Sequence, residues 1–252
     1  MSFCVLIPAR LASTRLPRKV LLDVGGLPMI EQVRRRAVAS GASRVVVAAD
    51  HPEIVACIED HGGEVLLTSP DHVCGTERLA EAARLLDLPA DAVIVNLQGD
   101  EPGMPPALLQ ATAKLLLENE ALKMATAAVP IHHWAELADP HAVKLICNDQ
   151  GHARYFSRAP IPWHRQYFPM QPQDPLPDGG HWWRHLGLYA YRHQFLQDYA
   201  RWPASPLEQI ESLEQMRALE RGVQIAVYCA AEVPPAGVDT LADLERVRRL
   251  FS

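Results

Sequence analysis

FCVLIPARLASTRLPRK, residues 3–19, joins a short apolar run to an irregular loop that is rich in arginine. The run Phe3–Ile7 has the composition of a buried β-strand. Four cationic side chains follow it on the loop, namely Arg10, Arg15, Arg18 and Lys19. Guanidinium and ammonium groups clustered in this way neutralise the oxyanions of a polyphosphate. The stretch therefore predicts a first strand that ends at a phosphate-binding loop, with a merely solvated loop as the alternative.

Strand-like and helix-like segments alternate from this loop to about residue 130. The predicted strands are Phe3–Ile7, Arg44–Ala48, Glu64–Leu67, Ala92–Leu97 and Lys123–Ala128, and the predicted helices are Met29–Ser40, Pro52–Asp60, Thr76–Leu86 and Pro105–Glu118. Alternation of this kind is typical of an α/β fold with a mainly parallel, doubly wound, Rossmann-like sheet. Ligands of such sheets bind outside the carboxyl ends of the strands.

The pattern changes after residue 130. We expect a hairpin, a long loop rich in proline and aromatic residues, a strand, a helix with a capping box at Ser205, another strand and a last helix. These segments are Val143–Cys147 with Ala153–Ser157, Ile161–Trp183, His185–Tyr191, Ser205–Arg221, Gln224–Cys229 and Thr240–Phe251. No linker divides the chain, so we expect one domain over residues 1–252. Its core would be about 1–130 and 222–252, with a smaller inserted lobe at about 131–221.

The composition limits the possible functions. The 252 residues carry a formal net charge of −6, which argues against a nucleic-acid partner. No apolar run is long enough for a membrane helix, and the N-terminus does not look like a signal peptide, so no membrane partner is expected. The five cysteines are widely spaced, as expected for reduced thiols in the cytoplasm. No Gly-x-Gly-x-x-Gly follows the first strand, which disfavours a nicotinamide dehydrogenase.

Two distant carboxylates are candidate metal ligands. Asp100 follows the predicted strand Ala92–Leu97, in the segment Asn96-Leu97-Gln98-Gly99-Asp100-Glu101-Pro102. Asp239 precedes the last helix, which Thr240 and Asp243 can cap without it. Mg²⁺ is usually held by one or two carboxylates together with phosphate oxygens. We therefore expect Asp100 and Asp239 to hold Mg²⁺; a turn residue and an N-cap are the alternatives.

Six ordered motifs resemble the cytidylyltransferases that activate acidic sugars. They are Ile7-Pro8-Ala9-Arg10 continuing to Lys19, Asn96 to Pro102, Tyr155 to Pro162, Arg184 to Tyr189, Leu207 to Arg217, and Gly237-Val238-Asp239-Thr240. The third to fifth motifs are most similar to the members that act on the sugar acid Kdo (3-deoxy-manno-octulosonate). The resemblance implies a nucleotide-diphospho-sugar transferase-like fold, CTP and Kdo as substrates, Mg²⁺ as cofactor and a homodimer. It also implies that the smaller lobe binds the sugar and dimerises.

The resemblance assigns roles to individual residues. Arg10, Arg15, Lys19, Asp100 and Asp239 would be catalytic, the two aspartates as metal ligands. The nucleotide would contact Pro8, Ala9, Arg10, Ser13, Arg15, Lys19, Cys74, Gly75, Arg78, Gly99 and Asp100. The sugar would contact Gln98, Arg158, His185, Tyr189, Glu214 and Gln215. Arg158 could instead bridge to a core carboxylate, and His185 with Tyr189 could be a structural pair on one face of a strand.

Two other functions and one departure from the family pattern stay open. A sialic-acid cytidylyltransferase shares the Pro-Ala-Arg start, and a catalytically inactive relative would still bind nucleotide. Arg18 stands where the family usually has glycine. Since arginine lacks glycine's freedom at positive φ, we expect an ordinary backbone conformation at Arg18.

Overall fold

The computed structural model describes residues 2–251 of the protein. A large mixed β-sheet lies at the centre of the fold. Its main path runs in the order β11 (Ile225–Cys229), β7 (Met124–Pro130), β10 (Trp183–Arg192), β6 (Val93–Asn96), β1 (Phe3–Ala9), β4 (Arg44–Ala49), β5 (Glu64–Leu67). All strands of this path are parallel except β10, which is antiparallel to both of its neighbours. The prediction of an α/β fold with a mainly parallel sheet is confirmed.

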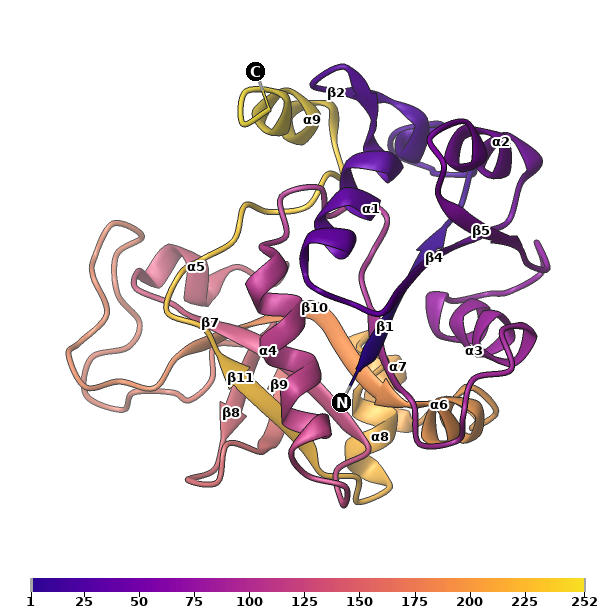
Figure 1. The fold of residues 1–252 in the computed structure, drawn as a ribbon. Coiled ribbons are helices and arrows are strands. Elements are labelled where there is room, and N and C mark those ends of the chain that lie inside the picture. The colour runs from indigo at the N-terminus through magenta and orange to yellow at the C-terminus, as the bar shows by residue number, and fades with distance from the viewer. Residues whose placement is uncertain (1, 252) are drawn as a thin grey trace.

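Helices cover both faces of the sheet (Figure 1). One face packs against α1 (Met29–Ala39), α2 (Pro52–Asp60) and α4 (Pro106–Leu117). The other face packs against α3 (Gly75–Leu85), α6 (His193–Ala200), α7 (Pro206–Glu211) and α8 (Met216–Glu220). All seven residues of β1 are buried, because successive side chains of a strand point to opposite faces and both faces here are covered.

The topology creates a switch point beside β1. The chain passes from β1 to β4 and β5 on one side and then returns through α3 to β6 on the other side. The loops that follow β1 and β6 therefore open away from each other at the carboxyl edge of the sheet. A ligand crevice is expected at this point in a doubly wound sheet.

Smaller elements complete the fold. A short 3₁₀ turn η1 (Lys19–Leu21) and the ribbon of β2 (Asp23–Val24) and β3 (Leu27–Pro28) follow the cationic loop. The hairpin of β8 (Lys144–Cys147) and β9 (Ala153–Ser157) adds to the sheet by pairing with β10. Helix α9 (Leu241–Arg248) lies beside β2, so the end of the chain returns to the cationic loop (Figure 1).

The region after residue 130 contributes to the core as well as to the surface. Strand β10 lies in the centre of the main sheet, between β7 and β6. The segment 161–182 has no regular helix or strand, as predicted, but Phe168 and Trp182 pack with Trp134 of α5 (Trp134–Ala138) in a small apolar cluster. The division into a core and an inserted lobe stays a prediction.

Two local predictions are wrong. The helix expected over Ser205–Arg221 is broken at Ser212, which has a left-handed backbone with φ 52°. The break turns the Glu211 carboxylate toward β9, where it accepts hydrogen bonds from Ser157 and from the Arg158 amide. Arg18 also has a left-handed backbone, with φ 58° and ψ 26°, and its guanidinium pairs with Glu53 of α2. The loop thus keeps a conformation that favours glycine, although arginine occupies the position.

Candidate active site

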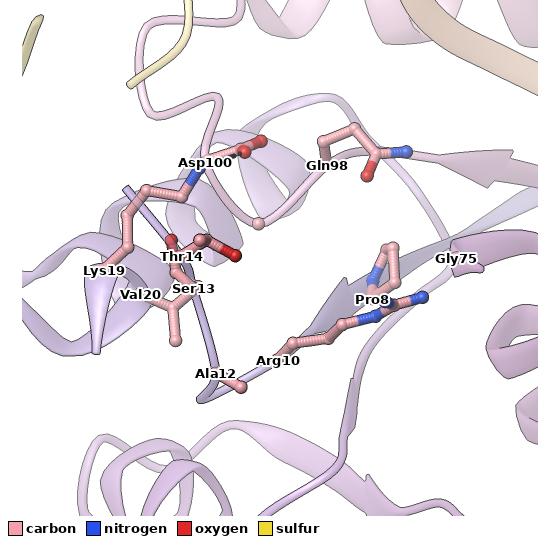
Figure 2. Close-up of a pocket in the computed structure, with 11 residues that line it drawn as sticks. Pro8, Arg10, Ala12, Ser13, Thr14, Lys19, Val20, Gly75, Gln98 and Asp100 are labelled. Atoms are coloured by element: carbon pink, nitrogen blue, oxygen red, sulfur yellow. Dashed lines mark hydrogen bonds and ion pairs between the residues drawn. The ribbon is translucent and has the colours of Figure 1, made fainter. Parts of the chain in front are cut away.

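A cavity of about 310 Å³ lies at the switch point, between the loops that follow β1 and β6. Its wall is made of Pro8, Arg10, Ala12, Ser13, Thr14, Lys19, Val20, Gly75, Gln98, Gly99 and Asp100. Figure 2 shows Lys19 extended toward Asp100, and Arg10 extended toward Gly75 at the start of α3. The cavity therefore combines cationic side chains from one loop with a carboxylate from the other.

Gly99 allows the two loops to approach each other. A Cβ atom at this position would lie 2.9 Å from the Pro8 carbonyl oxygen and 3.1 Å from a methyl group of Ile30. The backbone after β6 can pass this close to β1 only because residue 99 has no side chain. This contact fixes the position of Asp100 relative to the cationic loop.

Lys19 brings the two predicted metal ligands together. Its Nζ atom lies 2.7 Å from Asp100 Oδ2 and 3.1 Å from Asp239 Oδ1, and the lysine side chain is only 11% exposed. Arg15 pairs with the other oxygen of Asp239 at 3.1 Å. Burial alone would lower the pKa of Lys19, but the Asp100 and Asp239 carboxylates raise it, so the amine is charged. Two carboxylates separated by most of the chain thus share one positive charge.

Asp239 is free to take part in this cluster because other residues cap α9. The Thr240 hydroxyl and the Asp243 carboxylate form a complete capping box, as expected from the sequence. The Asp239 side chain is left half exposed beside Arg15 and Lys19. Within residues 2–251 no cluster of three or more histidine, cysteine, aspartate or glutamate side chains is arranged to hold a metal ion.

Glu101 is an acidic neighbour that the sequence did not identify. Burial, together with the nearby charges of Asp100 and Asp239, raises the pKa of Glu101 to about 8. A Cβ atom at residue 237 would lie 2.7 Å from Glu101 Oε1, so Gly237 leaves the room that this carboxyl group occupies. The only sequence signal for it was its position next to Asp100.

A second cavity of about 180 Å³ adjoins the first, since Gly75 and Gln98 line both. Its remaining wall is made of Thr76, Asn96, Tyr189, Tyr191, Tyr199, Glu214 and Gln215. Burial raises the pKa of Glu214, and the side-chain nitrogen of Gln215 is buried without a hydrogen-bond partner among residues 2–251. The cavity therefore offers several neutral donors and acceptors, which suits a ligand with many hydroxyl groups.

Four of the six residues that the resemblance assigned to the sugar line this second cavity: Gln98, Tyr189, Glu214 and Gln215. His185 lies next to it, with its ring 5.3 Å from that of Tyr189, so the two share one face as expected. The sequence did not identify Thr76, Asn96, Tyr191 and Tyr199. Tyr191 and Tyr199 follow the periodicity of core residues, and nothing local distinguishes them from such residues.

Arg158 lies outside both cavities. Its guanidinium donates to the carbonyl oxygens of Glu211 at 2.7 Å and Pro140 at 2.8 Å. It therefore has a structural role, in which it joins β9 to α7 and the loop before β8. The structural alternative was a bridge to a core carboxylate, whereas the observed acceptors are backbone carbonyl oxygens.

Four residues assigned to the nucleotide do not line the first cavity either: Ala9, Arg15, Cys74 and Arg78. Arg15 is largely exposed and pairs with Asp239. Ala9 is buried inside β1. The Cys74 thiol contacts Glu214, and burial raises the pKa of that thiol. Arg78 is fully buried and donates to Thr68 Oγ1 at 2.6 Å and the Ser69 carbonyl oxygen at 3.0 Å. Its Nε and Nη2 atoms have no hydrogen-bond partner in the described part of the chain.

Comparison with known proteins agrees with this arrangement. The family model described as cytidylyltransferase matches residues 4–225. A 3-deoxy-manno-octulosonate cytidylyltransferase of Acidithiobacillus ferrooxidans is 77% identical over 252 residues, which is all of both chains. That of Herminiimonas arsenicoxydans is 54% identical, also over all of both chains.

Solved structures give the same result. A CMP:2-keto-3-deoxy-manno-octonic acid synthetase in complex with CTP superposes with a TM-score of 0.90 and 39% identity, covering 99% of this chain and 98% of the other. A cytidylyltransferase of Leptospira borgpetersenii, 18% identical with a TM-score of 0.61, shares the fold and covers 98% of this chain and 85% of its own. The chain belongs to the cytidylyltransferase family, among the 3-deoxy-manno-octulosonate cytidylyltransferases.

Proposed function

We propose that the protein transfers the cytidylyl group of CTP to Kdo, giving CMP-Kdo and pyrophosphate. The observation that carries this proposal is the pair of adjoining cavities, one lined by cationic side chains and one lined mainly by uncharged polar side chains, which share Gly75 and Gln98. A triphosphate suits the first cavity and a polyhydroxylated sugar suits the second. In this arrangement the α-phosphate lies where the two cavities meet.

The reaction needs positioning and charge neutralisation more than a covalent intermediate. The anomeric hydroxyl of Kdo attacks the α-phosphorus in line, a new O–P bond forms, and the bond to pyrophosphate breaks. Arg10, Ser13, Arg15 and Lys19 bind the phosphate oxygens and stabilise the charge that develops on pyrophosphate. Gln98 stands between the cavities and orients the sugar.

Asp100 and Asp239 fit a hard divalent cation. Both carboxylates converge on the Lys19 ammonium group, so their oxygens already point at one positive charge. Mg²⁺ held there would neutralise phosphate charge and lower the pKa of the attacking hydroxyl. When the nucleotide binds, we expect Lys19 to exchange its carboxylate partners for phosphate oxygens.

We also propose a homodimer that works in the cytoplasm and supplies CMP-Kdo for the inner core of lipopolysaccharide. The rings of Trp163 and Tyr167 are half exposed, which supplies apolar surface for a second chain. The five cysteines are free thiols, in keeping with a reducing compartment. No helix within residues 2–251 has the length and apolar character needed to cross a membrane. Light scattering coupled to size exclusion tests the dimer, and a monomeric mass would contradict it.

A matrix of nucleotides and sugars, scored by pyrophosphate release with Mg²⁺, tests the activity. We expect release only from CTP with Kdo, and none from UTP, ATP or GTP. Faster release with sialic acid would establish the alternative substrate. Binding of CTP by calorimetry without pyrophosphate release from Kdo would establish an inactive relative.

Lys19→Met and Lys114→Met form a matched pair of variants for the same assay. Lys114 lies on α4 in an exposed ion pair with Glu118 and lines neither of the two cavities. We expect Lys19→Met to lower kcat by roughly 100-fold or more, the scale of removing one preorganised charge from a transition state. Lys114→Met should leave kcat unchanged.

A further inference from the structure

Thr126 of β7 lies opposite an irregularity in β10. The pairing of these two strands shifts register between Leu186 and Tyr189. Thr126 is fully buried there, and its hydroxyl oxygen lies 2.8 Å from the Leu188 carbonyl oxygen and 3.3 Å from that of Leu186. The hydroxyl thus lies within hydrogen-bond distance of both carbonyl groups that the bulge turns toward it.

The same hydroxyl oxygen lies 3.0 Å from His185 Nε2. The two carbonyl oxygens can only accept, and the hydroxyl has a single proton to donate. If that proton went to His185, two carbonyl lone pairs would face the hydroxyl oxygen with no hydrogen between them. The network is satisfied when Thr126 donates to Leu188 and accepts from a protonated Nε2.

The other ring nitrogen of His185 is then an acceptor without a protein partner. Among residues 2–251 no side chain or backbone group bonds to Nδ1. The ring packs edge-on against Phe156 at 5.0 Å and lies beside Tyr189, which lines the second cavity. Burial lowers the pKa of His185 to about 3, so the ring is neutral over the working range of pH.

We propose that Thr126 is a positioning residue, which holds His185 as the Nε2–H tautomer and so presents the Nδ1 lone pair to a hydroxyl group of the sugar acid. The inference rests on the proposed function, because it needs a sugar in the second cavity. Its chemistry is specific. A neutral ring with a fixed acceptor selects a hydroxyl donor at that position and adds no charge beside the sugar carboxylate.

The tautomer can be measured without substrate, by long-range ¹H–¹⁵N correlation on protein labelled at histidine. We expect one Nε2–H form of His185 in the wild type and in Thr126→Ser, which keeps the hydroxyl. Thr126→Val is isosteric but has no hydroxyl, and we expect it to give a mixture of tautomers. An Nδ1–H form in the wild type, or an unchanged spectrum in Thr126→Val, would overturn the inference.

Kinetics test the second half of the inference. We expect Thr126→Val to raise KM for Kdo about tenfold, the scale of one weakened hydrogen bond, with KM for CTP within about twofold of wild type. Thr126→Ser should restore KM for Kdo. In a His185→Phe background, Thr126→Val should add no further increase, because its effect passes through the imidazole.

Equal increases of KM for CTP and Kdo, or additive effects in the double variant, would show a merely structural role and overturn the inference. Failure of this inference can be distinguished from failure of the proposed function. A wild type that releases no pyrophosphate from CTP and Kdo contradicts the function, whereas the tautomer experiment is judged on the free protein.

Discussion

Arg18 has a left-handed backbone at the end of the cationic loop, directly before η1. That conformation costs a residue with a Cβ atom roughly 1–2 kcal/mol relative to glycine, and the exposed pair with Glu53 returns about 0–1 kcal/mol. We expect Arg18→Gly to be more stable than Arg18→Ala by about 1 kcal/mol, because both variants lose the ion pair and only alanine keeps the strain. Urea unfolding of both variants measures the difference. Equal stabilities would mean that the loop relaxes and that φ at residue 18 is not constrained.

Asp239 is placed to act in the reaction without stabilising the fold. Thr240 and Asp243 satisfy the first turn of α9, whereas the Asp239 carboxylate pairs with Arg15 and Lys19. We expect Asp239→Asn to lower turnover by about 100-fold or more, because the variant loses a charge and one of the two metal ligands that we propose. The melting temperature should stay within about 2 °C of wild type. A large loss of stability with turnover retained would assign Asp239 to the helix instead.

Asp243, in contrast to Asp239, stabilises a whole element of the fold, because its carboxylate caps the N-terminus of α9. Burial opposes ionisation of its carboxyl group, but hydrogen bonds from Thr240 and Arg246 outweigh it and lower the pKa of Asp243 to about 2. A depressed pKa in the folded state means that the stabilisation is complete above the unfolded value, about 3.9, and is lost as the pH falls toward 2.

We therefore expect Asp243→Asn to lower the free energy of unfolding by about 1–2 kcal/mol at pH 7. The gap between variant and wild type should close between about pH 5 and pH 2, where the wild-type carboxylate is protonated. Chemical unfolding across this range measures it. A gap that does not change with pH would mean that the Asp243 charge does not stabilise α9.

The whole molecule should respond to its ligands as one unit, because the loops after β1 and β6 line the first cavity and Asp239, which precedes α9, contacts Lys19 in its wall. Mg²⁺ and CTP at about 100 times Kd should stabilise the folded state by about 2.7 kcal/mol. With a chelator present, we expect CTP to stabilise less, since Asp100 and Asp239 then face the phosphates without a shared cation. Thermal unfolding with and without EDTA tests this, and equal shifts would argue against a metal at these carboxylates.

Local patterns in the sequence were enough to locate most elements. Pro52–Asp60 and Glu64–Leu67 have the predicted bounds, because each carries its own periodicity and end signals. The helix at Ser205 begins where its capping box predicted. The phosphate-binding role of the loop after β1 stays a prediction, and it rests on the order of an apolar strand and a basic loop. These features depend on neighbours along the chain, which the sequence displays directly.

Contacts between distant residues were decided only by the tertiary structure. Lys19 meets Asp100 across 81 positions and Asp239 across 220, and no periodicity records such a meeting. Strand β10 runs antiparallel to both of its neighbours, and its position in the sheet places Tyr189 and His185 beside the second cavity. Arg158 matches a sugar-binding motif, yet its guanidinium finds backbone carbonyls. The sequence determined which chemical groups were available and where the local structure would turn, whereas packing of the whole chain determined which groups face one another, because long-range contacts arise only when the sheet and its helices close on a common core.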